Sequence, residues 1–215
     1  MQDSIEIDRA DVRMLDDIIN IQRKCFPLSI RENALARFRK RWFLYLLGLP
    51  SVEIYAILVN QKIVGSYVLI VDLVCFQKHM SKISAVEKFV YYIGDALTII
   101  LRPQLIRPLI SKLISRIRTI NKKSRYPQFF LNRKTDPAKM VWCESVAILP
   151  EYQGLGLGKR LHKFIIKRAI ELGKKVLASR IDDTNKASIT FFKRLGYAAV
   201  SQGGNGALTY KKFLD

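Results

Sequence analysis

The 215-residue sequence has few of the residues that build disulfide frameworks or zinc sites. Its three cysteines, Cys25, Cys75 and Cys143, are widely spaced and form no CxxC pair, so we expect reduced thiols in a cytoplasmic protein. The two histidines, His79 and His162, lie far along the chain from any cysteine pair. The scarcity of both residue types argues against a metal site.

Long hydrophobic runs are also missing. A membrane-spanning helix needs about 20 mainly apolar residues, and the longest candidate, FVYYIGDALTIIL, carries Asp95 near its middle and stops at Arg102. The N-terminal segment MQDSIEIDRADVR is polar and acidic, which is not the pattern of a secretory signal. We therefore expect a cytoplasmic protein, with peripheral attachment to the inner face of the membrane as the alternative.

Acidic residues are scarce relative to basic ones. The 18 aspartates and glutamates are outnumbered by 37 lysines and arginines, which gives a formal net charge of +19. Such a charge attracts phosphate groups, whether on a nucleotide cofactor, a nucleic acid or an anionic membrane. It also describes a basic, solvated surface, so the charge alone does not choose among these partners.

The apolar residues, 49% of the chain, suffice for one large core. Their spacing, with the turn between Asn60 and Gln61, predicts a hairpin, and the alternation of strands and helices after residue 140 favours a mixed or parallel sheet. The predicted strands cover residues 5–10, 53–60, 62–71, 140–149, 174–182, 197–200 and 206–214, and the predicted helices cover 12–26, 31–48, 158–173 and 185–196.

Residues 76–139 interrupt this rhythm. They contain two apolar helical stretches, followed by the basic, turn-prone segment NKKSRYPQFFLNRKTDPAK. Strand-forming residues return only at Met140. The sequence therefore predicts a single domain over residues 1–215, with a basic helical insertion at about 76–139.

The segment EYQGLGLGKRL, residues 151–161, places three glycines at alternate positions before an apolar helix. A strand, a glycine turn and a helix N-terminus together are typical of a phosphate cradle. A Walker loop is excluded because Arg160 follows Gly158-Lys159 where Ser or Thr is needed. A dinucleotide fingerprint is excluded because it needs GxGxxG and an acidic residue about 20 positions later, whereas the spacing here is GxGxG and position 174 is lysine. A close crossing of helix and strand without ligand is the other explanation.

The remaining pattern, Gln153-x-x-Gly156-x-Gly158, resembles the Q/R-x-x-G-x-G/A signature of the GNAT superfamily of acetyl-coenzyme A-dependent acyltransferases. SVAILPEYQ resembles that family's fourth strand and the turn after it, and NKASITFFKRLGY resembles its later Asn-led helix. The resemblance is close over about residues 141–197 and looser over 1–75. It implies an α/β fold with a mixed, mostly antiparallel sheet flanked by helices, and a helical insertion before the fourth strand.

The same resemblance implies acetyl-CoA, or another acyl-CoA, as co-substrate. Backbone amides of residues 153–159 would hold its pyrophosphate, residues 146–148 would pair with its pantetheine arm, and Asn185 would bind that arm. The cofactor-binding residues implied in this way are Val146, Ala147, Ile148, Gln153, Gly154, Leu155, Gly156, Leu157, Gly158, Lys159, Asn185 and Phe192.

Two catalytic residues are expected. Glu144, in the fourth strand, stands where several family members carry the carboxylate that takes a proton from the acceptor amine. By strand alternation it shares a face with Trp142 and Val146. Pairing with a basic residue of the insertion, or plain exposure on the sheet, explains Glu144 equally well.

The general acid is less clear, because Phe192 occupies the position where the family commonly has a tyrosine. Tyr197, Ser188 or a water molecule could protonate the leaving thiolate, or the thiolate could leave unassisted. We expect Tyr197 to be catalytic.

The sequence thus predicts an N-acetyltransferase that acts on a primary amine of an unknown acceptor. A non-catalytic coenzyme A-binding module is one alternative, suggested by Phe192. An acetyltransferase directed to a charged RNA is the other, although no recognisable RNA-binding module accompanies the net charge. The oligomeric state is open.

The insertion contains an amphipathic pattern at LIRPLISKLISRIRTI, with apolar residues from Leu105 to Ile117 on one side and basic residues elsewhere. A helix of this kind docks on its own core or lies in a membrane interface. A hydrophobic acceptor groove, or weak contact with an anionic membrane through 76–139, is the expectation that follows.

Overall fold

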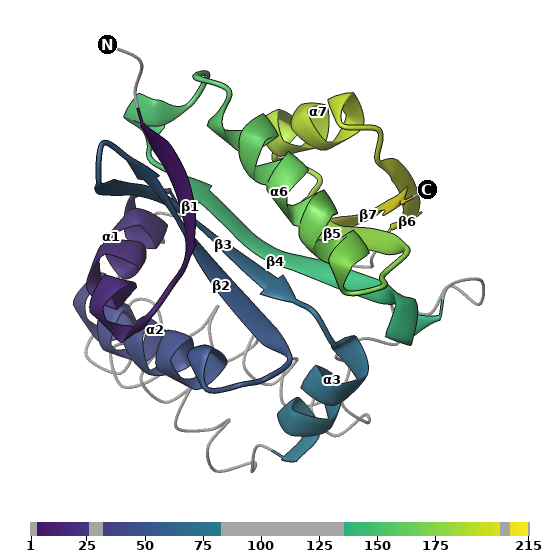
Figure 1. The fold of residues 1–215 in the computed structure, drawn as a ribbon, viewed down its shortest axis with the longest axis horizontal. Coiled ribbons are helices and arrows are strands. Elements are labelled where there is room, and N and C mark those ends of the chain that lie inside the picture. The colour runs from purple at the N-terminus through teal and green to yellow at the C-terminus, as the bar shows by residue number, and fades with distance from the viewer. Residues whose placement is uncertain (1–3, 26–31, 83–135, 203–206, 215) are drawn as a thin grey trace, which may run out of the picture.

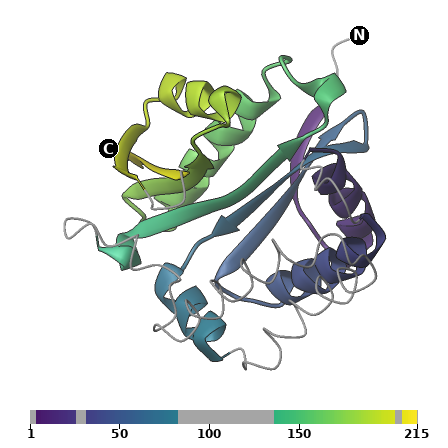
Figure 2. The same cartoon turned by 180° about the vertical axis from the view of Figure 1, so that it is seen from behind.

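The computed structural model describes residues 4–25, 32–82, 136–202 and 207–214. Within these residues a seven-stranded sheet in the order β1-β2-β3-β4-β5-β7-β6 crosses the molecule, with helices on both faces (Figures 1 and 2). Every neighbouring pair of strands is antiparallel except β4 and β5. The mostly antiparallel sheet is confirmed, and the parallel character that the strand–helix alternation favoured is confined to this pair.

The elements follow the predicted order along the chain. The strands are β1 (Ile5–Arg9), β2 (Val52–Val59), β3 (Lys62–Ile70), β4 (Met140–Ile148), β5 (Val176–Asp182), β6 (Ala198–Gln202) and β7 (Ala207–Phe213). The α-helices are α1 (Leu15–Cys25), α2 (Glu32–Leu47), α3 (Leu73–Lys82), α6 (Leu157–Glu171) and α7 (Lys186–Arg194). Short 3₁₀ turns at Val12–Met14, Pro137–Lys139 and Pro150–Tyr152 precede α1, β4 and the glycine loop.

Helices α1 and α2 cover one face of the sheet. Leu15 and Ile18 of α1 and Leu46 of α2 are almost fully buried in a core cluster that also includes Ile54 of β2 and Trp142 of β4. The β2–β3 hairpin beneath them turns at Asn60 and Gln61, whose φ angles of 49° and 66° suit the tight turn predicted there.

Helices α6 and α7 lie across the opposite face (Figure 1). Leu157, Leu161, Ile165 and Ala169 recur every four residues along α6, and all four are buried in a second core cluster. This spacing is the apolar stripe that a helix needs to dock on a sheet. The sheet therefore has a separate core layer on each side, and β4 contributes side chains to both.

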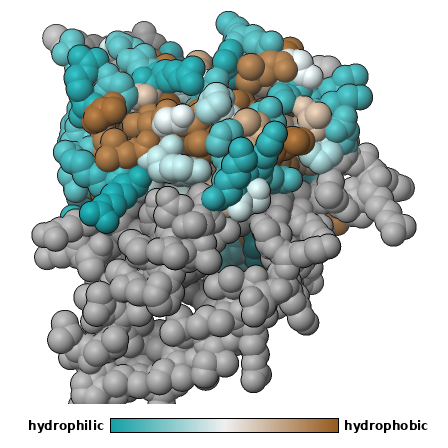
Figure 3. Space-filling view, turned by 90° about the horizontal axis from the view of Figure 1, so that it is seen from below, coloured by the Kyte–Doolittle hydropathy of each residue, from teal (hydrophilic) through white to brown (hydrophobic). Residues whose placement is uncertain are grey.

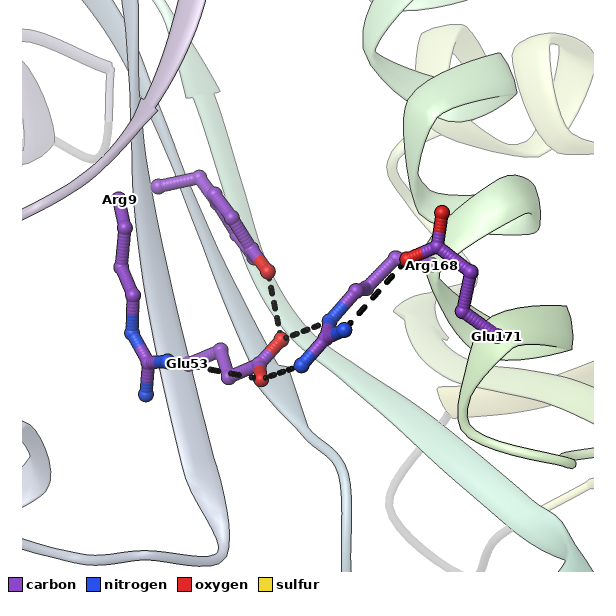
Figure 4. Close-up of polar contacts among 5 residues, drawn as sticks. Arg9, Glu53, Arg168 and Glu171 are labelled. Atoms are coloured by element: carbon purple, nitrogen blue, oxygen red, sulfur yellow. Dashed lines mark hydrogen bonds and ion pairs between the residues drawn. The ribbon is translucent and has the colours of Figure 1, made fainter.

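A buried ion pair joins α6 to β2 (Figure 4). Glu53, only 4% exposed, accepts hydrogen bonds from Arg168 at 2.6 Å and 3.0 Å and from the Tyr55 hydroxyl at 2.5 Å. Arg9 lies 3.8 Å from the same carboxylate. Desolvation alone would raise the pKa of Glu53, but the hydrogen bonds from Arg168 and Tyr55 outweigh it and the pKa is lowered. The pair fixes α6 on the sheet.

The approximate start of the predicted insertion falls within a helix. Helix α3 runs through the proposed boundary at residue 76, and both Leu73 and Phe76 are buried in the cluster beneath α1 and α2. The chain therefore stays with the core up to Lys82. The two predicted insertion helices, including the amphipathic pattern at 105–120, lie outside the described residues.

The surface of the described residues mixes polar and apolar side chains. Seen from below, hydrophobic residues form a broken band between hydrophilic ones (Figure 3). None of the helices in the described segments combines the length and the apolar character that crossing a membrane would require.

Candidate active site

Strands β4 and β5 pair over only four positions, from Met140 with Val176 to Cys143 with Ser179. The Ser179 hydroxyl donates to the Cys143 carbonyl at 3.1 Å where the pairing ends. Beyond that point the strands diverge (Figure 1), and in the described part of the chain residues 145–148 are paired only with β3. The free edge of β4 can therefore hydrogen-bond an extended ligand that carries amide groups.

A β-bulge lies where β4 leaves β5. Val68 of β3 pairs with Ser145 and Leu69 pairs with Cys143, so Glu144 has no partner on β3. The extra residue changes the face on which later side chains lie: Trp142 packs under α1 and α2, whereas Val146 packs against the cluster under α6. The expectation that Glu144 shares a face with Val146 is therefore wrong.

The Glu144 side chain stays on the Trp142 side. The Trp142 indole N–H donates to its carboxylate at 2.9 Å. Glu144 is exposed, yet many protein atoms surround the carboxyl group, and this desolvation raises its pKa against the opposing effects of the Trp142 hydrogen bond and the Arg180 charge. A carboxylate with a raised pKa is a stronger base at neutral pH than an ordinary glutamate.

The glycine loop leads from β4 into α6. Gly154 and Gly156 have φ angles of 81° and 78°, which favour glycine, and a Cβ at either would meet nothing within 4 Å. Gly156 is the N-cap of α6, so the first N–H groups of that helix have no preceding helical carbonyl to bind. The Gln153 side-chain amide donates a hydrogen bond to the Ile148 carbonyl at 2.8 Å, which holds the start of the loop against the end of β4. The open backbone here fits a phosphate group.

The third glycine has a different role. A Cβ on Gly158 would lie 3.1 Å and 3.2 Å from ring atoms of Phe191 on α7. Gly158 is therefore needed for the close approach of α6 and α7, and not for the helix–strand crossing that the ligand-free explanation proposed, whereas Gly154 and Gly156 face open space. The exposed Lys159 and Arg160 follow at the start of the helix.

The remaining predicted residues lie at or beside α7. Asn185 caps this helix, and its Oδ1 accepts from the Ser188 N–H at 3.0 Å, which leaves the amide NH₂ for a ligand. Phe192 is buried and packs edge-on against Tyr197, with ring centroids 4.8 Å apart. The Tyr197 hydroxyl is buried beside Cys143 without a hydrogen-bond partner among the described residues, and burial raises its pKa well above 10.

A polar network that the sequence did not reveal lies on the α1 side of β4. Gln22, 6% exposed on the otherwise apolar face of α1, donates to the hydroxyls of Ser66 and Ser145 at 3.0 Å each. Ser145 directly follows the bulge. The sequence signal for this network is a glutamine four residues after Ile18, inside the apolar stripe of the helix, because a buried polar side chain there needs hydrogen-bond partners.

The mixed sheet that opens beyond its one parallel pair, with helices on both faces, matches the folds of solved GNAT structures. The sequence model described as "Acetyltransferase (GNAT) family" matches residues 124–197. Over these residues the chain is similar to the GNAT superfamily.

The most similar curated proteins include the L-amino acid N-acyltransferase MnaT of Escherichia coli, 32% identical over 71 residues. That alignment covers 33% of this chain and 41% of MnaT, so the chain spans less than half the length of this relative in the match.

Solved structures match over nearly the whole chain. An acetyltransferase from Thermus thermophilus has a TM-score of 0.61 at 14% identity, over 98% of this chain and 97% of its own. The PaiA N-acetyltransferase from Thermoplasma acidophilum, in complex with coenzyme A, has a TM-score of 0.58 at 12% identity, over 98% and 99%. At these identities the likeness establishes the fold.

Proposed function

We propose that the protein is an N-acetyltransferase that transfers an acyl group, acetyl in the simplest case, from coenzyme A to a primary amine. The observation that carries the proposal is the free edge of β4 over residues 144–148. It runs from the bulged Glu144 at one end toward the glycine loop at the other, so in the proposal one strand connects the base to the phosphate site.

The residues at this edge fit an acyl-CoA co-substrate, which supplies the thioester. In the proposal, backbone N–H groups of the loop from Gln153 to Lys159, including Gly154, Leu155 and Leu157, hold the pyrophosphate. The backbone of Val146, Ala147 and Ile148 binds the pantetheine amides along β4, and the NH₂ group of Asn185 and the ring of Phe192 lie on the α7 side of the arm.

Glu144 acts as the base in this proposal. It takes a proton from the ammonium group of the acceptor, directly or through water, because only a neutral amine is a nucleophile. The amine nitrogen then bonds to the thioester carbon and passes its second proton to water, and the carbon–sulfur bond breaks. A backbone N–H among residues 146–148 stabilises the negative charge that develops on the carbonyl oxygen. Tyr197 protonates the departing thiolate.

A coenzyme A-binding module without catalysis is the second candidate. Its support is Phe192, which occupies the position of the family's usual acid and carries no ionisable group. Turnover separates the two candidates.

The experiment measures two properties of the full chain. Acetyl-CoA should raise the melting temperature, since a ligand that binds only the folded state stabilises it. Release of the coenzyme A thiol should then depend on an added amine. Stabilisation without thiol release from any amine would favour the binding module, and no stabilisation would contradict both candidates.

A further inference from the structure

Arg180 lies on β5 one residue beyond Ser179, the last residue that pairs with β4. Side chains alternate along a strand, so Arg180 shares the face of Ala178. Ala178 packs in the cluster with Trp142 beneath α1 and α2. Arg180 and Glu144 therefore flank the opening between β4 and β5 on the same side of the sheet.

The Arg180 guanidinium is close enough to Glu144 for its charge to oppose the desolvation of that carboxyl group. The residue is nevertheless exposed, and among the described residues its guanidinium forms no hydrogen bond or ion pair. A cation thus stands beside the proposed base without a carboxylate bound to it. Structural arginines such as Arg168 are, in contrast, fully engaged.

Three other residues of β5 and β7 surround Arg180 on this face. Asp182, two residues after Arg180, already accepts from both the N–H and the hydroxyl of Thr184 at 2.9 Å and 2.5 Å. Lys211 of β7 pairs with Ala178 and is buried on the same face. The residue opposite Arg180 on β7 is the neutral Thr209. An anion that enters here meets the exposed Arg180 guanidinium, whose charge also acts on the partly satisfied Asp182.

We propose that Arg180 binds a carboxylate of the acceptor while Glu144 receives the proton of the acceptor's amine, so that the acceptors are amino acids or other small amino carboxylates. The inference rests on the proposed function, because it adds a binding residue for the carboxylate of the same acceptor whose amine Glu144 deprotonates. A guanidinium matches a carboxylate with two parallel hydrogen bonds, and a small amino carboxylate carries its two charged groups close together, as the site does. The net charge of +19 assists the approach of such an acceptor.

The test compares each L-amino acid with its carboxamide, which keeps the side chain and the amine but removes the negative charge. Carboxamide amines are less basic, so the informative quantity is the ratio of variant to wild-type kcat/KM for each acceptor. Arg180→Gln should lower kcat/KM for the acids by about 10- to 100-fold, the loss of a charge-assisted hydrogen bond, and change that of the carboxamides by less than about threefold. Arg180→Lys should retain part of the activity on the acids.

Two controls keep the result specific. Lys167→Gln removes one exposed positive charge from α6, on the other face of the sheet, and should affect neither acceptor series. The KM for acetyl-CoA should be the same in all variants.

Equal losses on acids and carboxamides would overturn the inference, because Arg180 would then act only on Glu144. So would a raised KM for acetyl-CoA, or a wild-type enzyme that binds acetyl-CoA and acetylates only neutral amines or none of the acids. In each of these cases stabilisation by acetyl-CoA would still support the cofactor site. Its absence would instead contradict the proposed function.

Discussion

Gln22 Nε2 donates a hydrogen bond to the Ser145 hydroxyl at 3.0 Å, and the Ser145 hydroxyl donates to Gln22 Oε1 at 3.2 Å. The two residues are 123 positions apart in the sequence. This contact ties the middle of α1 to the first residue after the bulge in β4. The position of Glu144 therefore depends on a helix that does not contribute to the glycine cradle.

Gln22→Leu should destabilise the protein and slow acyl transfer. The hydroxyls of Ser66 and Ser145 lose their partner, which costs about 1–3 kcal/mol in the free energy of unfolding. Turnover should fall while acetyl-CoA still raises the melting temperature, because the cradle is untouched. Urea unfolding and thiol release measure the two effects, with Asp17→Asn on the exposed side of α1 as control. Normal turnover in a destabilised variant would make Gln22 purely structural.

Glu144→Gln should reduce turnover by about 10²–10⁴-fold, the range of a positioned base. Glu144 must be ionised to accept a proton, and its raised pKa places the acidic limb of the wild-type pH profile above 4.5. In the variant this limb should disappear, and residual turnover should rise with pH as the amine deprotonates. Glu151→Gln, a nearby exposed carboxylate, is the matched control. An unchanged pH profile would return Glu144 to a structural role.

Gly156→Val should abolish the stabilisation by acetyl-CoA. A valine strains the backbone at a φ of 78° and places a side chain where the phosphate would lie. Gly173, with a φ of 67° and open space around its Cβ position, lies after the other end of α6. Gly173→Val should therefore carry a similar strain and still respond to acetyl-CoA. Equal responses from the two variants in thermal unfolding would refute the cradle.

Tyr197→Phe should lower turnover by about tenfold or more, if its hydroxyl protonates the thiolate. The fold should not suffer, because this buried hydroxyl has no hydrogen-bond partner among the described residues and its removal leaves the contact with Phe192 in place. Thiol release and thermal unfolding together test the point. Full turnover in the variant would assign the proton to solvent.

Glu53→Gln should cost about 3–5 kcal/mol at pH 7, because it leaves Arg168 without its buried partner. The folded-state pKa of Glu53 is lowered, so the folded protein binds fewer protons at this site than the unfolded chain. The stabilisation is present above about pH 4.5 and is lost as the pH falls through the folded-state pKa. Urea unfolding across pH should show the two proteins converging at low pH. Glu171→Gln, whose pair with Arg168 is 3.4 Å long and exposed, should change little.

The sequence predicted those parts of the site that depend on local backbone chemistry. The hairpin turn at Asn60 and the loop glycines Gly154 and Gly156 follow from the residues that accept a positive φ. The bulge at Glu144 could not be predicted in the same way, because it is a mismatch between two strands about 75 residues apart and appears only when β3 and β4 pair.

Contacts between distant elements were equally hidden. The role of Gly158 is decided by Phe191, and the role of Gln22 by Ser145, and neither partner is visible from the local pattern. The helix over residues 73–82 was not predicted either, and only Val71 and Asp72 separate it from β3.

The bulge also separates what the sheet needs from what the chemistry needs. Cys143 and Val146 face the cluster under α6, whereas Trp142 and Ser145 lie on the side of α1. If Glu144 were missing, these four residues would alternate between the two faces without a break. A chain shorter by that residue could pair β4 with β3 as an uninterrupted ladder. Glu144 is thus a single residue inserted into an otherwise complete strand. Its side chain can be substituted without repacking the core on either face of the sheet.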